Sequence, residues 1–375
     1  MLHFEQGQPG QGEEILRFAH RAFATEYDVD FPALLPKLYG PQAACEGQHL
    51  LLYDGECLAG LLALQVQDFR TAGCLLRTGW IGTVCTAPEY RGQGLLAALM
   101  ERANRLAEES GCDLVVLGGQ RQRYQPFGYE RAGTHWLFTA SARNLRDVPR
   151  APGLALRPMA REDVPQALAL MERRPVYARR SAEGFVDVLR SWGCRPLSVW
   201  QRQVWAGYCA ADGTGLVLEL ALERPELCAG VLAVLAERLG GEVRLMAGPW
   251  AGEIQRQAAA LCEQAVLQAD HSYRVLHWPQ VVRAALALRA LCGPPLCDGR
   301  LELDIEGQGG YEIQVRDGTA CCRPQPPAGG AAVRLTPNQA VRLLFGPDSA
   351  LVPGAQAAPA GWLPLPLCLP WADGI

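Results

Sequence analysis

A glycine-rich turn, Arg91-Gly92-Gln93-Gly94, is the segment of the sequence best suited to chemistry. Before it, Trp80–Thr86 mixes β-branched and aromatic residues and is closed by Pro88, which predicts a strand. From Leu95 the apolar residues recur at helical spacing, so the turn opens onto a helix N-terminus. Backbone N–H groups and the helix dipole there suit a pyrophosphate, and Arg91 adds a cationic fork. A plain strand-to-helix connection is the alternative for these residues.

Two further segments follow the predicted helix. Cys112–Gly118 (CDLVVLG) is typical of a buried strand, and Tyr124-Gln125-Pro126-Phe127-Gly128-Tyr129 comes shortly after it. The glycine turn and this second motif, in this order, resemble the GNAT acyltransferases, which use acetyl-CoA. Arg91–Leu96 matches their (Arg/Gln)-x-x-Gly-x-(Gly/Ala) loop except at Leu96, and the second motif matches their Tyr-x-x-Phe-Gly-(Tyr/Phe) segment.

The resemblance implies where acetyl-CoA would bind as a co-substrate. In the GNAT fold the central strand and the strand after the helix splay apart. The pantetheine arm lies in the gap and bonds to open strand backbone, as an added strand would. The site implied here consists of main-chain groups of the central strand together with the turn, namely Thr83, Val84, Cys85, Arg91, Gly92, Gln93, Gly94, Leu95 and Leu96.

Tyr124 is the candidate catalytic acid. Acetyl transfer from a thioester needs a neutral amine, a positioned carbonyl and a proton for the departing thiolate. A tyrosine with a pKa of about 10 stays protonated near neutrality and can donate to that thiolate. Tyr124 stands at the family's acid position, three residues before Phe127. A packing role is the alternative for Tyr124, and Tyr129 is expected to be structural.

Composition excludes several other classes of function. The chain has 375 residues, of which 49% are hydrophobic and 20% charged, and a net charge of −4, which gives no basic footprint for nucleic acid. The fourteen cysteines are scattered without a CxxC pair or a histidine cluster, so buried thiols in a reducing compartment are expected, with no metal. No signal peptide or run of about 18 apolar residues is visible, which predicts a cytoplasmic protein without a membrane partner.

Residues 1–150 are expected to form a first, catalytic domain. Glu13–Thr25 has the apolar spacing of a helix, and an acidic stretch with Glu26, Asp28 and Asp30 follows it. In the GNAT fold this connection borders the acceptor pocket, so the three carboxylates would attract a cationic amine; a solvated loop is the alternative. Strands are predicted at His49–Asp54, Leu58–Phe69 and Leu75–Thr86, with Trp136–Ala140 as the last strand of the domain.

Residues 151–290 are expected to form a second, degenerate GNAT-like domain. They repeat the order of strands and helices of the first domain and close with a strand at Tyr273–His277. The glycine turn is replaced by Leu222–Leu227 (LERPEL), in which the backbone cannot approach a pyrophosphate closely and Glu223 and Glu226 would repel it. This domain is therefore not expected to bind CoA.

Residues 291–375 resemble a small α+β sterol-carrier-like domain. Leu301–Ile305, Tyr311–Arg316 and Ala331–Leu335 read as strands, and Thr336 is the expected cap of a helix that runs to Phe345. The predicted fold class is thus α/β (α+β), with tandem GNAT folds, each a mixed sheet flanked by helices, and this third domain. The whole layout resembles acetyltransferases of the Enhanced Intracellular Survival (Eis) type.

The Eis-type resemblance also implies a general base. In that family the carboxylate at the C-terminus reaches back into the active site. The matching group here is the α-carboxylate of Ile375, although family members commonly end on an aromatic residue; Asp373 is a rival, and a frayed tail is the alternative.

These observations predict an N-acetyltransferase that moves an acetyl group from acetyl-CoA to a primary amine of a small cationic molecule or a lysine side chain. The resemblance also implies a homo-oligomer. Two other classes stay open at this point: a non-catalytic acyl-CoA-binding regulator, and a lipid carrier that works through the last domain.

Overall fold

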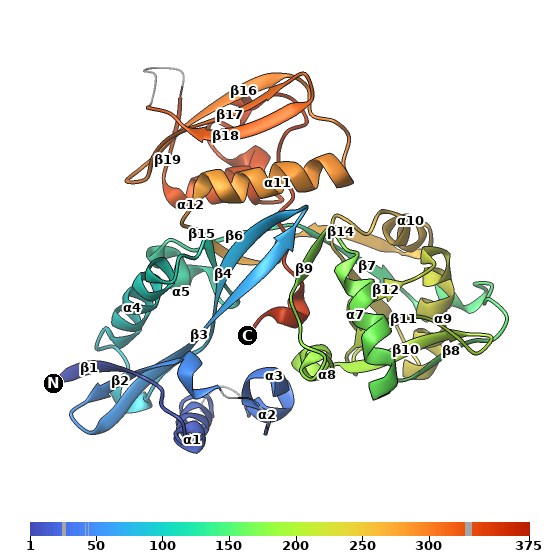
Figure 1. Cartoon of the computed structure of the whole chain (residues 1–375), viewed down its shortest axis with the longest axis horizontal. Coiled ribbons are helices and arrows are strands. Elements are labelled where there is room, and N and C mark those ends of the chain that lie inside the picture. The colour runs from blue at the N-terminus through green and yellow to red at the C-terminus, as the bar shows by residue number, and fades with distance from the viewer. Residues whose placement is uncertain (25–27, 42, 44, 327–331) are drawn as a thin grey trace.

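The structure is a computed structural model that describes residues 1–24, 28–41, 43, 45–326 and 332–375, and these residues form three sheets (Figure 1). The first sheet contains the segments predicted to carry the chemistry. Its strand order is β1 (Leu2–Gln6), β2 (His49–Asp54), β3 (Cys57–Thr71), β4 (Cys74–Thr86), β5 (Leu114–Leu117), β15 (His271–Val275) and β6 (Glu130–Ala132), with β9 (Val176–Ala178) paired to β3 at the side.

The helices of this part cover both faces of the first sheet. They are α1 (Gly12–Phe23), α2 (Phe31–Leu34), α3 (Pro36–Tyr39), α4 (Leu95–Glu109) and α5 (Arg121–Tyr124). Helix α4 packs on β3 and β4 through the apolar face that the sequence predicts, with Leu95, Leu99 and Met100 buried. Helix α1 contacts the same two strands but belongs to a different hydrophobic cluster, because it lies on the opposite face.

The second sheet lies beside the first (Figure 1). Its order is β14 (Gln264–Gln268), β7 (His135–Ala140), β13 (Val243–Ala247), β12 (Leu216–Leu222), β11 (Val204–Ala211), β10 (Arg195–Gln201) and β8 (Leu154–Pro158). Its helices are α6 (Ala142–Arg146), α7 (Val164–Glu172), α8 (Phe185–Arg190), α9 (Cys228–Leu239) and α10 (Gly252–Leu261).

The third sheet has the order β18 (Thr319–Pro324), β17 (Gly309–Arg316), β16 (Gly299–Ile305) and β19 (Val333–Leu335). Helix α11 (Trp278–Cys292) packs between β18 and the hairpin of β3 and β4, and α12 (Pro337–Phe345) packs on β6 and β15. The expected cap of α12 is confirmed, because the Thr336 side chain accepts a hydrogen bond from the backbone N–H of Gln339.

Two strands are exchanged between the first and second sheets. The prediction that Trp136–Ala140 closes the first domain is wrong, because β7 pairs with β13 and β14 in the second sheet. The strand predicted at Tyr273–His277 is likewise misplaced, because β15 pairs with β5 and β6 in the first sheet. The segment that contains β6 and β7 pairs with the segment that contains β14 and β15: β6 with β15 in the first sheet, and β7 with β14 in the second. This pairing replaces the ladder expected within each domain.

The C-terminal segment ends where the two exchanged sheets meet, near the centre of the molecule (Figure 1). The backbone N–H of Thr134 donates to the carbonyl of Leu367 (2.7 Å), and the N–H of Leu369 donates to the buried carboxylate of Asp270 (3.2 Å). Residues 372–375 are all buried. The segment is therefore packed and hydrogen-bonded to the end of the chain, and the frayed-tail alternative does not hold.

Among the described helices, none combines the length and the apolar composition that crossing a bilayer would require.

Candidate active site

Strands β4 and β5 separate at the position predicted for the co-substrate. Their parallel pairing covers Thr78–Ile81 on β4, and Gly82–Thr86 continue beyond it. On the other edge of β4, the register with β3 shifts between Leu61 and Ala63, which marks a β-bulge at Thr83 and Val84. Thr83 has a φ of +48°, which is unusual for a β-branched residue. The bulge and the separation leave β4 backbone groups outside the regular ladder, as an added strand-like ligand requires.

A cavity of about 400 Å³ opens beside this separation. The glycine turn forms one of its walls: Gly92 and Gly94 have φ values of +77° and +81°, a region that residues with a Cβ rarely adopt, and Gly94 caps α4. The N-terminus of α4 therefore faces the cavity. The predicted co-substrate residues that line it are Val84, Cys85, Arg91, Gly92, Gly94, Leu95 and Leu96.

Thr83 and Gln93, the remaining two predicted co-substrate residues, turn their side chains elsewhere. The Thr83 hydroxyl is bonded to Tyr39, and the Gln93 amide donates to the carbonyl of Glu89 (3.1 Å). Their expected contribution was through the main chain, with which these bonds do not compete. Arg123 also lines the cavity and was not predicted, because it matches no motif residue.

Tyr124 lies just beyond the end of β5. Its ring is buried and packs on Gly119, which follows the end of β5. Burial raises the pKa of the Tyr124 hydroxyl, so the group stays protonated through the neutral range. Tyr129 is fully buried and its hydroxyl donates to Asn104 on α4 (2.6 Å), as expected for a structural residue.

The end of the chain reaches β4 from the opposite face of the sheet. A Cβ built on Gly82 would stand 2.5 Å from the main-chain carboxyl carbon of Ile375, and one on Gly374 would stand 3.0 Å from the ring of Trp80. Only a residue without a side chain at position 82 leaves room for this contact. The carboxyl group of Ile375 thus lies beside the bulge, one residue from Thr83.

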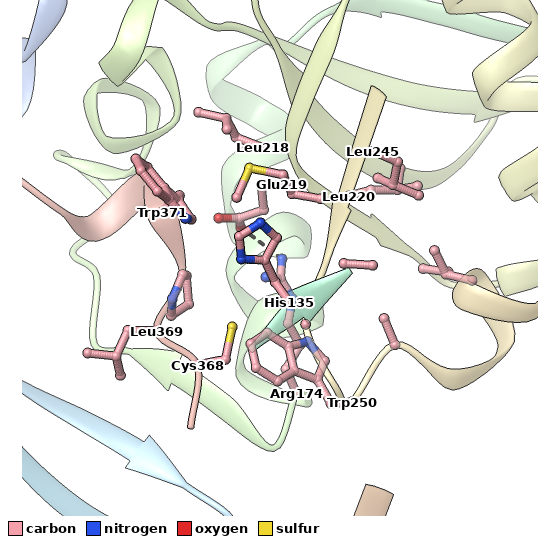
Figure 2. Close-up of a pocket in the computed structure, with 16 residues that line it drawn as sticks. His135, Arg174, Leu218, Glu219, Leu220, Leu245, Trp250, Cys368, Leu369 and Trp371 are labelled. Carbon is pink, nitrogen blue, oxygen red and sulfur yellow. Dashed lines mark hydrogen bonds and ion pairs between the residues drawn. The ribbon is translucent and has the colours of Figure 1, made fainter. Parts of the chain in front are cut away.

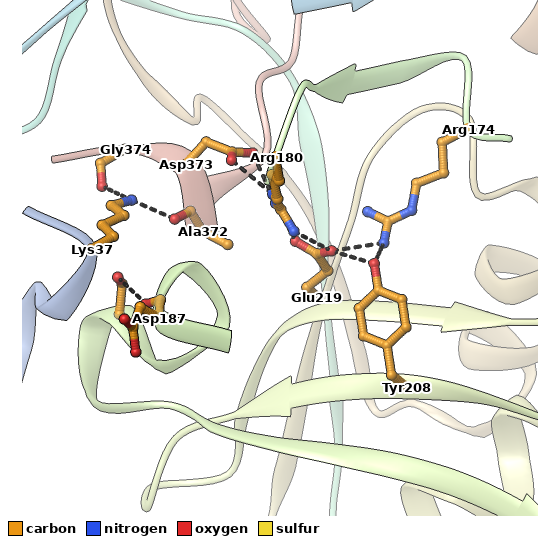
Figure 3. Close-up of polar contacts among 10 residues, drawn as sticks. Lys37, Arg174, Arg180, Asp187, Tyr208, Glu219, Ala372, Asp373 and Gly374 are labelled. Carbon is orange, nitrogen blue, oxygen red and sulfur yellow. Dashed lines mark hydrogen bonds and ion pairs between the residues drawn. The ribbon is translucent and has the colours of Figure 1, made fainter. Parts of the chain in front are cut away.

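Lys37, the only lysine of the chain, holds this terminal turn (Figure 3). Its Nζ donates to the carbonyls of Ala372 and Gly374, the latter at 2.6 Å. Burial lowers the pKa of Lys37 from 10.5 to about 7, although the nearby carboxylate of Asp373 opposes this shift.

This pKa gives a testable pH dependence of stability. Between pH 7 and 10.5, Lys37 is protonated in the unfolded chain and largely neutral in the folded chain, so its contribution to the free energy of unfolding rises with pH. Relative to Lys37→Met, the wild type is expected to gain stability between about pH 7 and about pH 9 in urea unfolding. Parallel pH curves for the two proteins would contradict the assignment.

A buried ion network fixes the same turn from the side of the second sheet (Figure 3). The guanidinium of Arg180, 1% exposed, donates to both carboxylate oxygens of Asp373 (2.9 and 2.8 Å) and to both of Glu219 on β12 (3.0 and 2.9 Å). Glu219 also accepts from Arg174 and Tyr208. Burial alone would raise the pKa of Glu219, but the charges of Arg180 and Arg174 hold it well below its usual range.

The bulge itself is supported by a chain of buried hydrogen bonds. The Tyr39 hydroxyl is bonded to Thr83 Oγ1 (2.7 Å) and to His49 Nε2 (2.9 Å). His49 Nδ1 lies 2.8 Å from the carbonyl of Cys45, which can only accept, so Nδ1 carries a proton. Helix α3 therefore holds two neighbouring features at β4: Lys37 holds the terminal turn, and Tyr39 holds the bulge.

The acidic residues predicted for the acceptor lie in different situations. Asp30 caps α2, because its Oδ1 accepts from the backbone N–H of Ala33 (3.1 Å), and Asp28 is exposed. Glu26 lies outside the described residues. Their contact with substrate stays a prediction.

The second sheet has a gap at the place equivalent to the separation of β4 and β5, and the C-terminal segment fills this gap. Strands β12 and β13 pair in parallel only at Leu216–Val217 with Arg244–Leu245. Beyond this pair, residues 368–371 lie against both strands and leave a cavity of about 50 Å³ (Figure 2). Figure 2 shows His135, Trp371 and Cys368 around this small space. A pantetheine arm would not fit there, in line with the missing glycine turn.

The comparison with protein families accounts for the first part of the chain. Residues 5–132 match the model of the acetyltransferase (GNAT) domain. The chain therefore carries a GNAT domain. The match spans the separated strands, the glycine turn and Tyr124. The matched range ends with β6, before the first exchanged strand.

Solved structures extend the likeness of fold to the whole chain. A GCN5-related N-acetyltransferase from Kribbella flavida has 20% identity and a TM-score of 0.67, covering 94% of this chain and 90% of its own. One from Anabaena variabilis has 16% identity and a TM-score of 0.67, covering 95% and 93%. Eis1 from Mycobacterium abscessus has 16% identity and a TM-score of 0.60, covering 92% and 90%. These likenesses show a shared mixed α/β fold. The comparison with curated proteins gave no match.

Within the described residues, no cluster of three or more His, Cys, Asp or Glu side chains has the arrangement of a metal site.

Proposed function

We propose that the protein transfers an acetyl group from acetyl-CoA to a primary amine at the separation of β4 and β5. The observation that carries the proposal is that the glycine-turn cavity and the main-chain carboxyl group of Ile375 both lie at β4, the first beside Val84 and Cys85 and the second against Gly82. Tyr124 packs on Gly119, just after β5, the strand that separates from β4 there. These are the parts that acyl transfer between a thioester and an amine requires.

Acetyl-CoA supplies the activated acyl group, and the residues of the chain bind, orient and exchange protons. The turn and the α4 N-terminus suit the pyrophosphate, and β4 backbone near Val84 suits the pantetheine arm. The carboxylate of Ile375 accepts the proton of the acceptor amine. Tyr124, protonated because its pKa is raised by burial, donates a proton to the departing thiolate.

Asp373 was the rival for the base, and its contacts support another role. Both of its oxygens are engaged by the guanidinium of Arg180 in a buried pair. With both oxygens turned to the guanidinium, this carboxylate is not directed toward an amine at β4. We therefore assign the base to Ile375, and Asp373 to the positioning of the terminal turn.

The other expectations belong to the same proposal: a three-domain layout with boundaries near residues 150 and 290, an Eis-type enzyme, a homo-oligomer, and a cytoplasmic location. A lipid carrier is not favoured, because the third sheet packs on α11 and α12 through large buried side chains such as Trp278 and Phe345. A regulator that only binds acyl-CoA remains the second candidate and is separated by the following experiment.

Replacement of Tyr124 by Phe tests the proposed acid. The hydroxyl is lost and the buried ring is kept, so we expect kcat to fall by about 10²- to 10⁴-fold, with binding of acetyl-CoA unchanged. Thiol release with a panel of primary amines measures turnover, and calorimetry measures acetyl-CoA binding. Tyr129→Phe is the control for kcat: its hydroxyl bonds only Asn104 among the described residues, so the change acts on stability. Binding of acetyl-CoA without turnover on any amine by the wild type would favour the regulator.

A further inference from the structure

The cavity of the glycine turn has one charged residue in its wall that belongs to neither motif, Arg123 of the short helix α5. Arg123 lines this cavity of about 400 Å³ together with Val84 and Cys85 of β4. Tyr124 is the next residue, but it is buried and is not part of the cavity wall. Arg123 therefore borders both the proposed acid and the space proposed for the co-substrate.

Arg123 acts directly on the hydroxyl of Tyr124. Burial raises the pKa of that hydroxyl, but the charge of Arg123 and a hydrogen bond with its side chain both lower it. A guanidinium carries only donors, so Arg123 donates to the hydroxyl oxygen in this contact. The thiol of Cys85, which lines the cavity on β4, also affects this pKa. The hydroxyl of Tyr124 therefore lies near Arg123 and near the β4 wall of the cavity.

The charges of the cavity wall favour a negative group in the cavity. Its described residues include two arginines, Arg91 and Arg123, and no carboxylate. Burial raises the pKa of Cys85 to about 12, and partial desolvation raises that of Tyr90, so both groups stay neutral near pH 7. Arg91 belongs to the turn, and its guanidinium donates to the carbonyl of Ala22 (3.2 Å). Arg123 is exposed and forms no ion pair with a described residue, so no carboxylate compensates its charge there.

Acyl transfer produces one negative charge in this region. When the acceptor nitrogen forms its bond with the acetyl carbon and the carbon–sulfur bond breaks, the electron pair stays on the sulfur of CoA. Tyr124 then gives its proton to the sulfur and carries the charge until solvent returns a proton. A fixed cation near both atoms stabilises the charge in either position, and such stabilisation of the transition state accelerates the reaction.

We propose that Arg123 stabilises the departing thiolate of CoA and the phenolate of Tyr124, as a further catalytic residue of the proposed reaction. This inference rests on the proposed function and adds a group that the motifs do not contain. The other role for an arginine in this cavity is to bind the phosphates, as proposed for the turn with Arg91. The two roles differ in the part of the co-substrate that the cation meets.

Two acetyl donors separate these roles: acetyl-CoA, and S-acetylpantetheine, which has the same thioester and arm but no phosphate. We expect Arg123→Met to lower kcat/KM by about 10- to 100-fold with both donors, because the thioester is common to them. Arg91→Met is the comparison for phosphate binding, and its loss should be much larger with acetyl-CoA than with S-acetylpantetheine. Thiol release with one and the same amine measures these rates.

Two further variants of α5 show whether the charge is the cause. Arg123→Lys keeps a cation and should stay within about fivefold of the wild-type rate, the difference reflecting the lost fork of donors. Gln122→Met, at the exposed neighbouring position, leaves the cation in place and should have the wild-type rate. Because Arg123 is exposed, its replacement is not expected to alter folding, which urea unfolding checks.

An equilibrium measurement tests the same charge without turnover. CoA and desulfo-CoA differ only in the thiol, so the ratio of their affinities reports how the protein treats the sulfur. A free thiol has a pKa of about 8.5, and a nearby cation lowers the pKa of the bound thiol. The ratio should therefore rise about three- to tenfold in favour of CoA between about pH 6.5 and about pH 9. Most of this rise should disappear in Arg123→Met, as calorimetry with both ligands measures.

The outcomes separate this inference from the proposed function. A loss confined to acetyl-CoA would assign Arg123 to the phosphates, and no loss, or an equal loss in Arg123→Lys and Arg123→Met, would also overturn the inference. If the wild type acetylates no amine, the proposed function fails and the ratio of affinities alone decides. A rise with pH that depends on Arg123 then supports the inference, and a flat ratio or an unchanged rise in Arg123→Met overturns it.

Discussion

Removal of Gly374 and Ile375 is expected to lower kcat by about 10²- to 10⁴-fold, the contribution of a positioned general base. The shortened chain ends on Asp373, whose side chain is held by Arg180, so its new terminus cannot reach the position beside Gly82. The affinity for acetyl-CoA should stay unchanged, since the residues removed do not line the cavity of the glycine turn. Thiol release and calorimetry measure the two effects separately.

Two single substitutions make this expectation sharper. Ile375→Val keeps the carboxylate and should retain most of the activity. Gly82→Ala places a methyl group 2.5 Å from the carboxyl carbon of Ile375, which forces the terminus to move without shortening the chain. It should therefore reproduce much of the loss of the truncation. Full activity in both the truncated chain and Gly82→Ala would show that another group is the base.

Arg180→Met is expected to cause the largest loss of stability, about 3–5 kcal/mol in the free energy of unfolding, because it removes the arginine partner of the buried Asp373 and leaves the buried Glu219 with Arg174 alone. Both Glu219 and Asp373 have side chains that are 2% exposed or less. Urea unfolding measures the change. Arg173→Met is the matched control: Arg173 pairs with Glu223 at the surface, where an ion pair contributes about 1 kcal/mol or less.

The same network allows a rescue. If the loss in Arg180→Met comes from uncompensated charge, the triple variant with Glu219→Gln and Asp373→Asn should regain part of the stability. Its activity should remain low, because the terminal turn is then no longer held by Arg180. A loss in Arg180→Met no larger than that in Arg173→Met would mean that water or another group compensates these carboxylates.

The local parts of the site could be read from the sequence. The glycine turn, the helix after it and the position of Tyr124 depend on residues within about one strand–turn–helix unit, and their apolar spacing or left-handed glycines specify them directly. The Ile375 contact was expected only through resemblance to a family. Nothing in the spacing of the last residues indicates which strand they approach.

The remaining parts depend on partners far apart in the chain. Arg180, Glu219 and Asp373 come from three distant segments, so their pairing has no local signal. A weaker signal was present: Glu219 is the one charged residue in the apolar run LVLELAL, and a carboxylate in such a strand needs a buried partner. A second weak signal was that Lys37 is the only lysine of the chain. The strand exchange had no signal in the sequence, because the residues of β7 and β15 would suit a strand in either sheet.

The exchange of β7 and β15 also bears on how such a protein can be inherited. A gene cut after residue 150 would encode a first sheet without β15, whose place lies between β5 and β6, together with a surplus strand, β7. Neither product would be a complete unit, and each would present bare strand edges to other chains. Within this chain the catalytic part is therefore not a self-contained module. A substitution in β7 or β15 acts on the sheet of the other half, so each half constrains one strand of the other.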